Sequence, residues 1–182
     1  MTRAVTISYS LCFFAALAAL IFVTAHRAMA DLNVGDTAPS FSLKTQDGIN
    51  FNLEQRKGQG WTVLYFYPKA ETPGCTKEAC AFSDSIDKVR SLGAEVYGIS
   101  ADTVREQRAF HNNHHLKFDL LADPNGDVIT LYGAKMPLVT MAKRWTFILD
   151  PELVIRSVDR DVDPVKDADR VAAELQELKT KK

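Results

Sequence analysis

The sequence lacks an excess of charge of either sign, because 22 lysine and arginine residues stand against 23 aspartate and glutamate residues in a chain of 182. No basic stretch is interleaved with aromatic residues, and the basic tail at residues 179–182 is short. These absences argue against a nucleic-acid-binding surface, since such a surface needs clustered lysine and arginine. We interpret the tail as the solvated end of a last helix.

Internal repeats, low-complexity segments and long linkers are also absent. Long apolar runs are scarce too, and the clearest one, residues 11–23, follows Arg3 near the N-terminus. About 150 residues remain beyond this leader, with enough valine, leucine, isoleucine and phenylalanine to bury one core. We therefore predict a single domain over residues 31–182.

The leader carries the signals of protein export. Residues 28–30 read Ala-Met-Ala before Asp31 and satisfy the small-x-small rule for signal peptidase. We expect residues 1–30 to be a signal peptide, which would place the mature protein in the periplasm or outside the cell. An uncleaved membrane anchor is the alternative, although the apolar core is shorter than the ~20 residues that a spanning helix prefers.

Cysteine is scarce, with three residues in the whole chain. Cys12 lies in the leader and follows Leu11 rather than a small residue, so we do not expect lipoprotein attachment. Cleavage would leave Cys75 and Cys80 as the only thiols. Both lie in the segment at residues 67–80, which we interpret as a redox site.

Cys75 is expected at the start of a helix. Residues 61–67 are β-branched and aromatic without polar alternation except at Thr62, which is typical of a strand buried on both faces. Residues 72–74 are turn and cap residues, so the helix should begin beside Cys75 and run towards Leu92. Free backbone N–H groups and the positive end of the helix dipole would stabilise a thiolate there.

The spacing of the two cysteines predicts local unfolding. Five residues along an intact helix put Cys75 and Cys80 about 140° apart, with Cα atoms separated by roughly 8 to 9 Å. A disulfide needs Cα atoms within about 7 Å. A bond between these cysteines would therefore require the start of the helix to unwind. On spacing alone, a static structural disulfide or a metal site stays open.

Cys75 and two residues before it form a recognisable motif. Pro68, Thr72 and Cys75 stand as P-x-x-x-T-x-x-C, which resembles the peroxidatic loop of the peroxiredoxins. A second cysteine five residues later, here Cys80, is similar to the bacterioferritin-comigratory or peroxiredoxin Q branch. Arg144 before a T-F-x-x-D strand fits the same branch, and the likeness runs from about residue 34 to the C-terminus.

The resemblance implies a mechanism. Cys75 would attack the O–O bond of hydrogen peroxide or an alkyl hydroperoxide and become a sulfenic acid, and Cys80 would condense with it to a disulfide. Thr72 would place its hydroxyl near the sulfur, and Arg144 would favour the thiolate and the developing charge on the leaving oxygen. Pro68 would shield the pocket through its shape. The family implies no metal or organic cofactor.

The expected partners follow from the same resemblance and from export. An oxidising compartment lacks the cytosolic thiol supply, so the enzyme would need a dedicated electron donor, which we infer to be thioredoxin-like. We expect a monomer. The fold implied is α/β and thioredoxin-like, with a central mixed sheet flanked by helices. Without the resemblance, the element order does not separate it from flavodoxin-like folds.

Two other functional classes fit parts of this pattern. Two cysteines with His111, His114 and His115 resemble an exported copper-binding chaperone, since copper favours thiolate and imidazole, but such chaperones place three residues between the cysteines. A polar helix end is the simpler interpretation of these histidines. A protein thiol-disulfide oxidoreductase would normally use Cys-x-x-Cys.

Two further expectations concern the surroundings of the site. Glu71 would oppose a thiolate if it pointed inward, so we expect it to face solvent. The segment from Met136 to Met141 has no clear period, and it could line the substrate mouth or simply cover the core. The elements expected are strands at 41–45, 49–53, 61–67, 94–100, 118–121, 145–149 and 154–158, and helices at 75–92, 103–112, 126–132 and after 164.

Overall fold

The structure is a computed structural model that describes residues 32–180. The predicted signal peptide and its cleavage site fall on residues 1–31 and lie outside the described residues. Within residues 32–180, no helix combines the length and the apolar character needed to cross a membrane.

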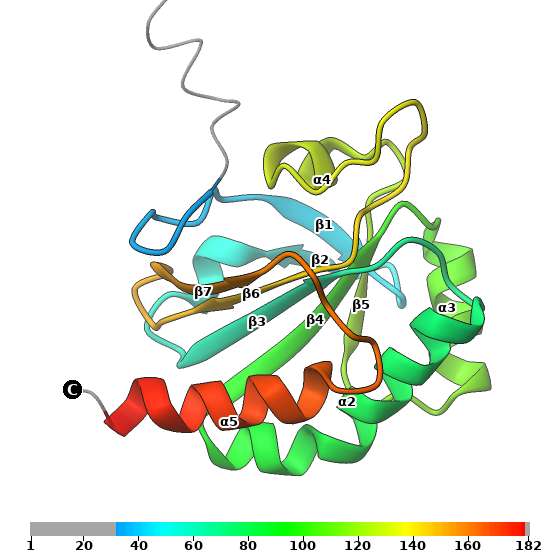
Figure 1. The fold of residues 1–182 in the computed structure, drawn as a ribbon. Helices are drawn as coiled ribbons and strands as arrows, with labels where there is room; N and C mark the ends of the chain where they lie inside the picture. The colour runs from blue at the N-terminus through cyan, green and yellow to red at the C-terminus, as the bar shows by residue number, and fades with distance from the viewer. Residues whose placement is uncertain (1–31, 181–182) are drawn as a thin grey trace, which may run out of the picture. The chain divides into compact units, whose positions relative to one another are not determined.

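A single mixed sheet of seven strands forms the centre of the described domain, in the order β2-β1-β5-β4-β3-β6-β7 (Figure 1). At its middle, β3 (Trp61–Phe66) is buried along its whole length and pairs parallel with β4 (Ala94–Ser100) and antiparallel with β6 (Trp145–Leu149). The prediction of a doubly buried strand is confirmed. The outer strands are β1 (Ser42–Thr45), β2 (Asn50–Asn52), β5 (Asp119–Ala122) and β7 (Ile155–Asp159).

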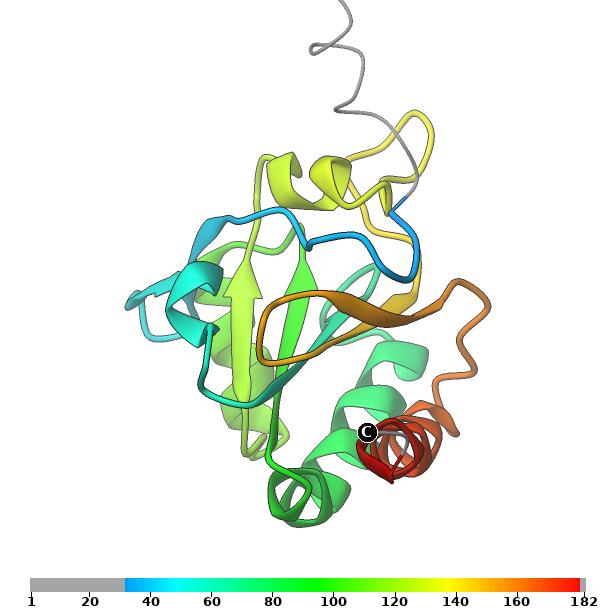
Figure 2. The same cartoon turned by 90° about the vertical axis from the view of Figure 1, so that its left-hand side faces the viewer.

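Helices cover both faces of the sheet. On one face lie α2 (Pro73–Ser91), α3 (Val104–Asn113) and α5 (Asp167–Thr180), and α2 packs directly against α5. On the other face lies the short α4 (Asp127–Leu131). Figure 2 shows α5 nearly end-on, with α4 across the sheet from it. The chain thus forms the mixed α/β, thioredoxin-like layers that the family resemblance implies.

The alternation of side chains along β3 divides the core into two clusters. Val63 and Tyr65 face α2 and α5, whereas Leu64 and Phe66 face α4. Close packing also explains one glycine in β4. A Cβ atom on Gly98 would lie 2.6 Å from the ring of Tyr65, so no larger residue fits without moving that ring.

Local signals set most boundaries. Thr103 and Glu106 form a capping box at the start of α3, close to the start of the helix expected at 103–112. The expected strand at residues 49–53 is shorter, because Asn52 accepts a hydrogen bond from the Glu54 amide and begins a 3-10 helix, η2 (Leu53–Arg56). The strands expected at 41–45 and 49–53, and those expected at 145–149 and 154–158, form antiparallel pairs, β1 with β2 and β6 with β7.

Candidate active site

Cys75 lies in the first turn of α2, and its side chain is buried, with 1% of the residue exposed. Thr72 is the N-cap residue but makes no capping hydrogen bond, and its Oγ1 donates to the Lys69 carbonyl at 2.9 Å. Pro73 has no N–H, so the amides of Gly74 and Cys75 are the uncapped donors of this turn. The helix start thus places its positive dipole end at the Cys75 sulfur.

Arg144 reaches this sulfur from the neighbouring strand. Antiparallel pairing of β3 and β6 sets Trp145 opposite Phe66, which brings Arg144 to the end of β3 where the cysteine loop begins. Its Nη2 donates to Cys75 Sγ at 3.3 Å. The pairing therefore joins two residues that lie 69 positions apart in the chain.

Glu78 is a residue of the site that sequence reasoning missed. It is completely buried, its Oε2 pairs with Arg144 Nη1, and its Oε1 has no hydrogen-bond partner within the described residues. A signal was present, since Glu78 is three residues after Cys75 and lies on the helix face that also buries Ala79 and Phe82. A charged residue on a predicted core face is a reason to look for a buried partner.

Burial dominates the protonation of Glu78. Burial, with a smaller contribution from the nearby carboxylate of Asp167, raises the pKa of this carboxyl to about 8, against the lowering effect of the Arg144 charge. Asp167 in turn is buried and accepts hydrogen bonds from Thr146 at 2.7 Å and from Arg170. A carboxyl that is largely protonated near neutral pH leaves the guanidinium charge of Arg144 available to the Cys75 sulfur.

The raised pKa predicts a pH-dependent stability. The unfolded carboxyl titrates near 4.5, so between pH 4.5 and 8 the folded state binds more protons than the unfolded state, and stability falls as the pH rises. From pH 5 to 8.5 we expect wild type to lose roughly 2–4 kcal/mol of unfolding free energy relative to Glu78→Gln. Urea denaturation of both proteins across this range measures the difference, and parallel curves would contradict it.

Cys80 lies on the same uninterrupted helix as Cys75, and both thiols are free. Burial, followed by the charge of Asp84 one turn further on, raises the pKa of Cys80. The prediction of unwinding assumed that both cysteines lie on one intact helix, and α2 is such a helix. Unwinding itself stays a prediction. Pro68 is half-buried and directly follows β3 and Tyr67.

Glu71 is exposed, as expected, but it is not free. Its carboxylate accepts a hydrogen bond from Asn113 Nδ2 at 2.8 Å and pairs with His114 Nε2 at 2.9 Å. Both hydrogen bonds lower the pKa of Glu71, and the one with His114 has the larger effect.

The histidines lie at the polar end of α3, where His111 is in the last turn and His114 is the C-cap residue. This agrees with the helix-end interpretation. Across residues 32–180, no group of three or more histidine, cysteine, aspartate and glutamate residues is arranged to hold a metal ion.

The segment from Met136 to Met141 forms a small hairpin, closed by a hydrogen bond from the Met136 amide to the Met141 carbonyl at 2.9 Å. Leu138 at its tip is fully exposed and has a positive φ of 67°. A role at the substrate mouth stays a prediction.

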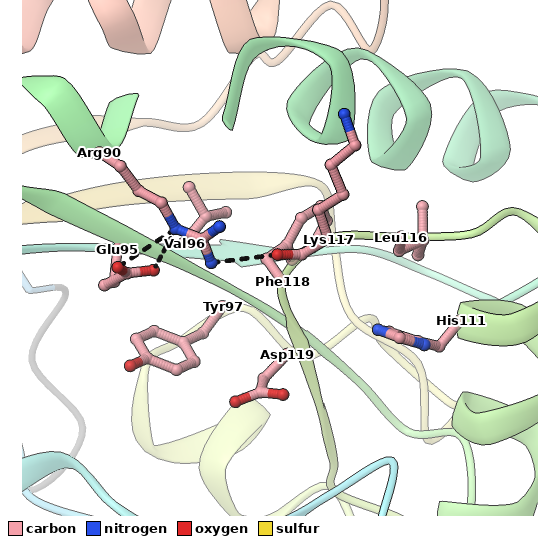
Figure 3. Close-up of a pocket in the computed structure, with 9 residues that line it drawn as sticks. All are labelled: Arg90, Glu95, Val96, Tyr97, His111, Leu116, Lys117, Phe118 and Asp119. Atoms are coloured by element: carbon pink, nitrogen blue, oxygen red, sulfur yellow. Dashed lines mark hydrogen bonds and ion pairs between the residues drawn. The ribbon is translucent and has the colours of Figure 1, made fainter. Parts of the chain in front are cut away.

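A surface pocket of about 310 Å³ lies away from this site (Figure 3). Arg90 and Glu95 point towards one another in it, and Arg90 also donates to the Lys117 carbonyl at 3.0 Å. Because α2 starts at Cys75 and Arg90 lies in its last turn, the pocket and the cysteine occupy opposite ends of this helix.

Comparison with known proteins agrees with this geometry. The AhpC/TSA family matches residues 34–158. A chloroplastic peroxiredoxin Q from Populus jackii is 41% identical over 151 residues, which cover 82% of this chain and 70% of the relative. The crystal structure of peroxidoxin BcpB from Mycobacterium tuberculosis superposes with a TM-score of 0.76 and 35% identity, covering 80% of this chain and 97% of the other.

A second solved structure, the bacterioferritin comigratory protein of Xanthomonas campestris, superposes with a TM-score of 0.73 and 28% identity. The match covers 80% of this chain and 96% of the Xanthomonas chain. These comparisons do not favour a copper chaperone or a protein thiol-disulfide oxidoreductase. The chain belongs to the AhpC/TSA family, in its peroxiredoxin Q and bacterioferritin-comigratory branch, and is a thiol-dependent peroxidase.

Proposed function

We propose that this peroxidase works by an atypical two-cysteine mechanism, with Cys75 as the peroxidatic and Cys80 as the resolving residue. The observation that carries the proposal is the 3.3 Å contact between Arg144 Nη2 and Cys75 Sγ at the start of α2. A cation and a helix N-terminus at one buried sulfur favour a thiolate and a negative leaving oxygen.

In the first step, the Cys75 thiolate attacks one peroxide oxygen and the O–O bond breaks. The sulfur becomes a sulfenic acid, and the other oxygen leaves with a proton as water or as an alcohol. Arg144 stabilises the charge that builds on the leaving oxygen. Thr72 already donates its hydroxyl hydrogen to the Lys69 carbonyl, so its oxygen offers an acceptor to the peroxide hydrogen. Pro68 closes the loop side of the pocket.

In the second step, the Cys80 sulfur attacks the sulfenic acid, a disulfide forms and water leaves. An intact α2 keeps the two Cα atoms roughly 8 to 9 Å apart, so the first turns of the helix unwind before this bond forms. The oxidised protein is therefore expected to differ from the reduced one at residues 72–80.

A thioredoxin-like dithiol then returns two electrons and two protons, which restores both thiols. We further propose a monomer that is exported to an oxidising compartment. Hydrogen peroxide and alkyl hydroperoxides are the proposed substrates. The second class is supported by the bacterioferritin comigratory protein of Xanthomonas campestris, for which alkyl peroxide reduction activity is described.

The test is steady-state turnover with a thioredoxin, its reductase and NADPH. We expect NADPH oxidation that depends on both thioredoxin and peroxide, with hydrogen peroxide and with cumene hydroperoxide. Peroxide-dependent oxidation of the protein without turnover by thioredoxin, but with turnover by glutaredoxin or another dithiol, would overturn the proposed donor.

A further inference from the structure

The segment between β3 and α2 is anchored to the start of α3. Lys69 pairs with the buried carboxylate of Asp102 and with Glu106 at 3.3 Å. The Ala70 amide donates to Asp102 Oδ2 at 2.9 Å, and Ser100 Oγ donates to the same oxygen at 2.7 Å. Because Asp102 is buried and has several partners, residues 69–70 are fixed to the segment that joins β4 to α3.

A second anchor holds Glu71, the next residue, to the other end of α3. Its carboxylate bonds Asn113 and His114 at 2.8 and 2.9 Å. The His114 ring packs edge-on against Phe110, with centroids 5.1 Å apart, which keeps the imidazole in place. We call the contacts of Glu71 with Asn113 and His114 the α3 clamp.

Glu71 also has strained backbone geometry. Its φ is +63°, a left-handed conformation that residues other than glycine rarely adopt. Such a conformation persists when the surrounding contacts hold it. The α3 clamp supplies such contacts, and Glu71 directly precedes the N-cap Thr72. Glu71 is therefore the last residue held to α3 before the part of α2 that must unwind.

We propose that the α3 clamp is a positioning device that sets how fast α2 unwinds to bring Cys75 to Cys80. With Glu71 held, unwinding must begin at Thr72, and the left-handed residue cannot relax. Without the clamp, the strain at Glu71 is released on unwinding and the mobile segment becomes longer. This inference rests on the proposed disulfide step, and it assigns Glu71 and His114 no contact with the peroxide.

Loss of the clamp should change the rates of the two steps differently. The α3 clamp lies outside the Arg144 contact, and the helical form stays in the majority, so peroxide attack should change less than about twofold. Partly exposed side-chain contacts have modest strength, so we expect Glu71→Ala and His114→Phe each to speed disulfide formation by about three- to fivefold. Phenylalanine keeps the ring packing on Phe110 and removes only the bond to Glu71.

The experiment is stopped-flow mixing of reduced protein with hydrogen peroxide, which separates a peroxide-dependent phase from a later peroxide-independent phase. The double variant should be no faster than the faster single variant if the two residues act through one contact. Glu95→Ala is the matched control, because it removes an exposed ion pair with Arg90 at the other end of α2. Unchanged or slower disulfide formation in both single variants would overturn the proposal.

Hydrogen exchange of the reduced proteins supplies a readout that needs no peroxide. We expect faster amide exchange across residues 74–80 in the clamp variants and unchanged exchange in Glu95→Ala. Equal exchange in all of them would overturn the clamp even if the peroxidase cycle holds. Wild-type protein that forms no disulfide between Cys75 and Cys80 would instead overturn the proposed function, with the exchange result still reporting on the contact itself.

Discussion

Replacing Cys75 with serine is expected to lower the second-order rate constant of peroxide consumption by more than about a thousandfold. A serine hydroxyl is a weak nucleophile at neutral pH, whereas the proposed first step needs the Cys75 sulfur, which lies 3.3 Å from Arg144 Nη2. The change is small in volume, so the fold and the Arg144–Glu78 pair should remain. Peroxide loss under excess dithiol measures the effect.

Cys12→Ser in the full-length chain is the matched control for the loss of a thiol. Cys12 belongs to the predicted signal peptide, and peroxide consumption should be unaffected. Circular dichroism and thermal denaturation verify that Cys75→Ser is folded. Residual turnover within tenfold of wild type would show that another group attacks the peroxide.

Replacing Cys80 with serine should separate the first step from the rest of the cycle. One equivalent of peroxide is consumed at a rate within about twofold of wild type, because the Cys80 side chain points about 140° away from Cys75 on an intact helix. The enzyme then stalls as a sulfenic acid, which dimedone traps and intact mass identifies. With the thioredoxin system we expect at least a hundredfold loss of steady-state turnover.

A small external thiol should partly restore turnover of Cys80→Ser, because it can take the place of the resolving sulfur in a mixed disulfide. Ser83→Ala is the control, because it changes α2 one turn from Cys80 and keeps both cysteines. Full turnover of Cys80→Ser with thioredoxin alone would mean that the donor reduces the sulfenic acid directly, and it would remove Cys80 from the cycle.

Much of the fold could be predicted because its signals are local. The apolar run that forms β3 has no polar alternation, and a strand of this kind is buried on both faces. Thr103 and Glu106 mark the start of α3 through a motif contained in four residues. The expected position of Cys75 at the start of a helix followed from Pro73 and its neighbours in the same way.

The polar partners of the site could not be predicted, because they depend on which elements lie side by side. Glu78 meets Arg144 through the pairing of β6 with β3. Glu71 meets His114 through the packing of α3 beside the loop. Periodicity describes the face on which a residue lies but not its partner on another element. Arg144 could be predicted only through the family resemblance.

The most direct test of the proposed cycle is single-turnover mixing of reduced protein that begins at residue 31 with one equivalent of hydrogen peroxide, followed by intact mass and peptide mapping. We predict rapid peroxide loss, a mass decrease of two hydrogens and a bridge between Cys75 and Cys80. Slow or absent peroxide loss with both thiols intact would contradict the cycle.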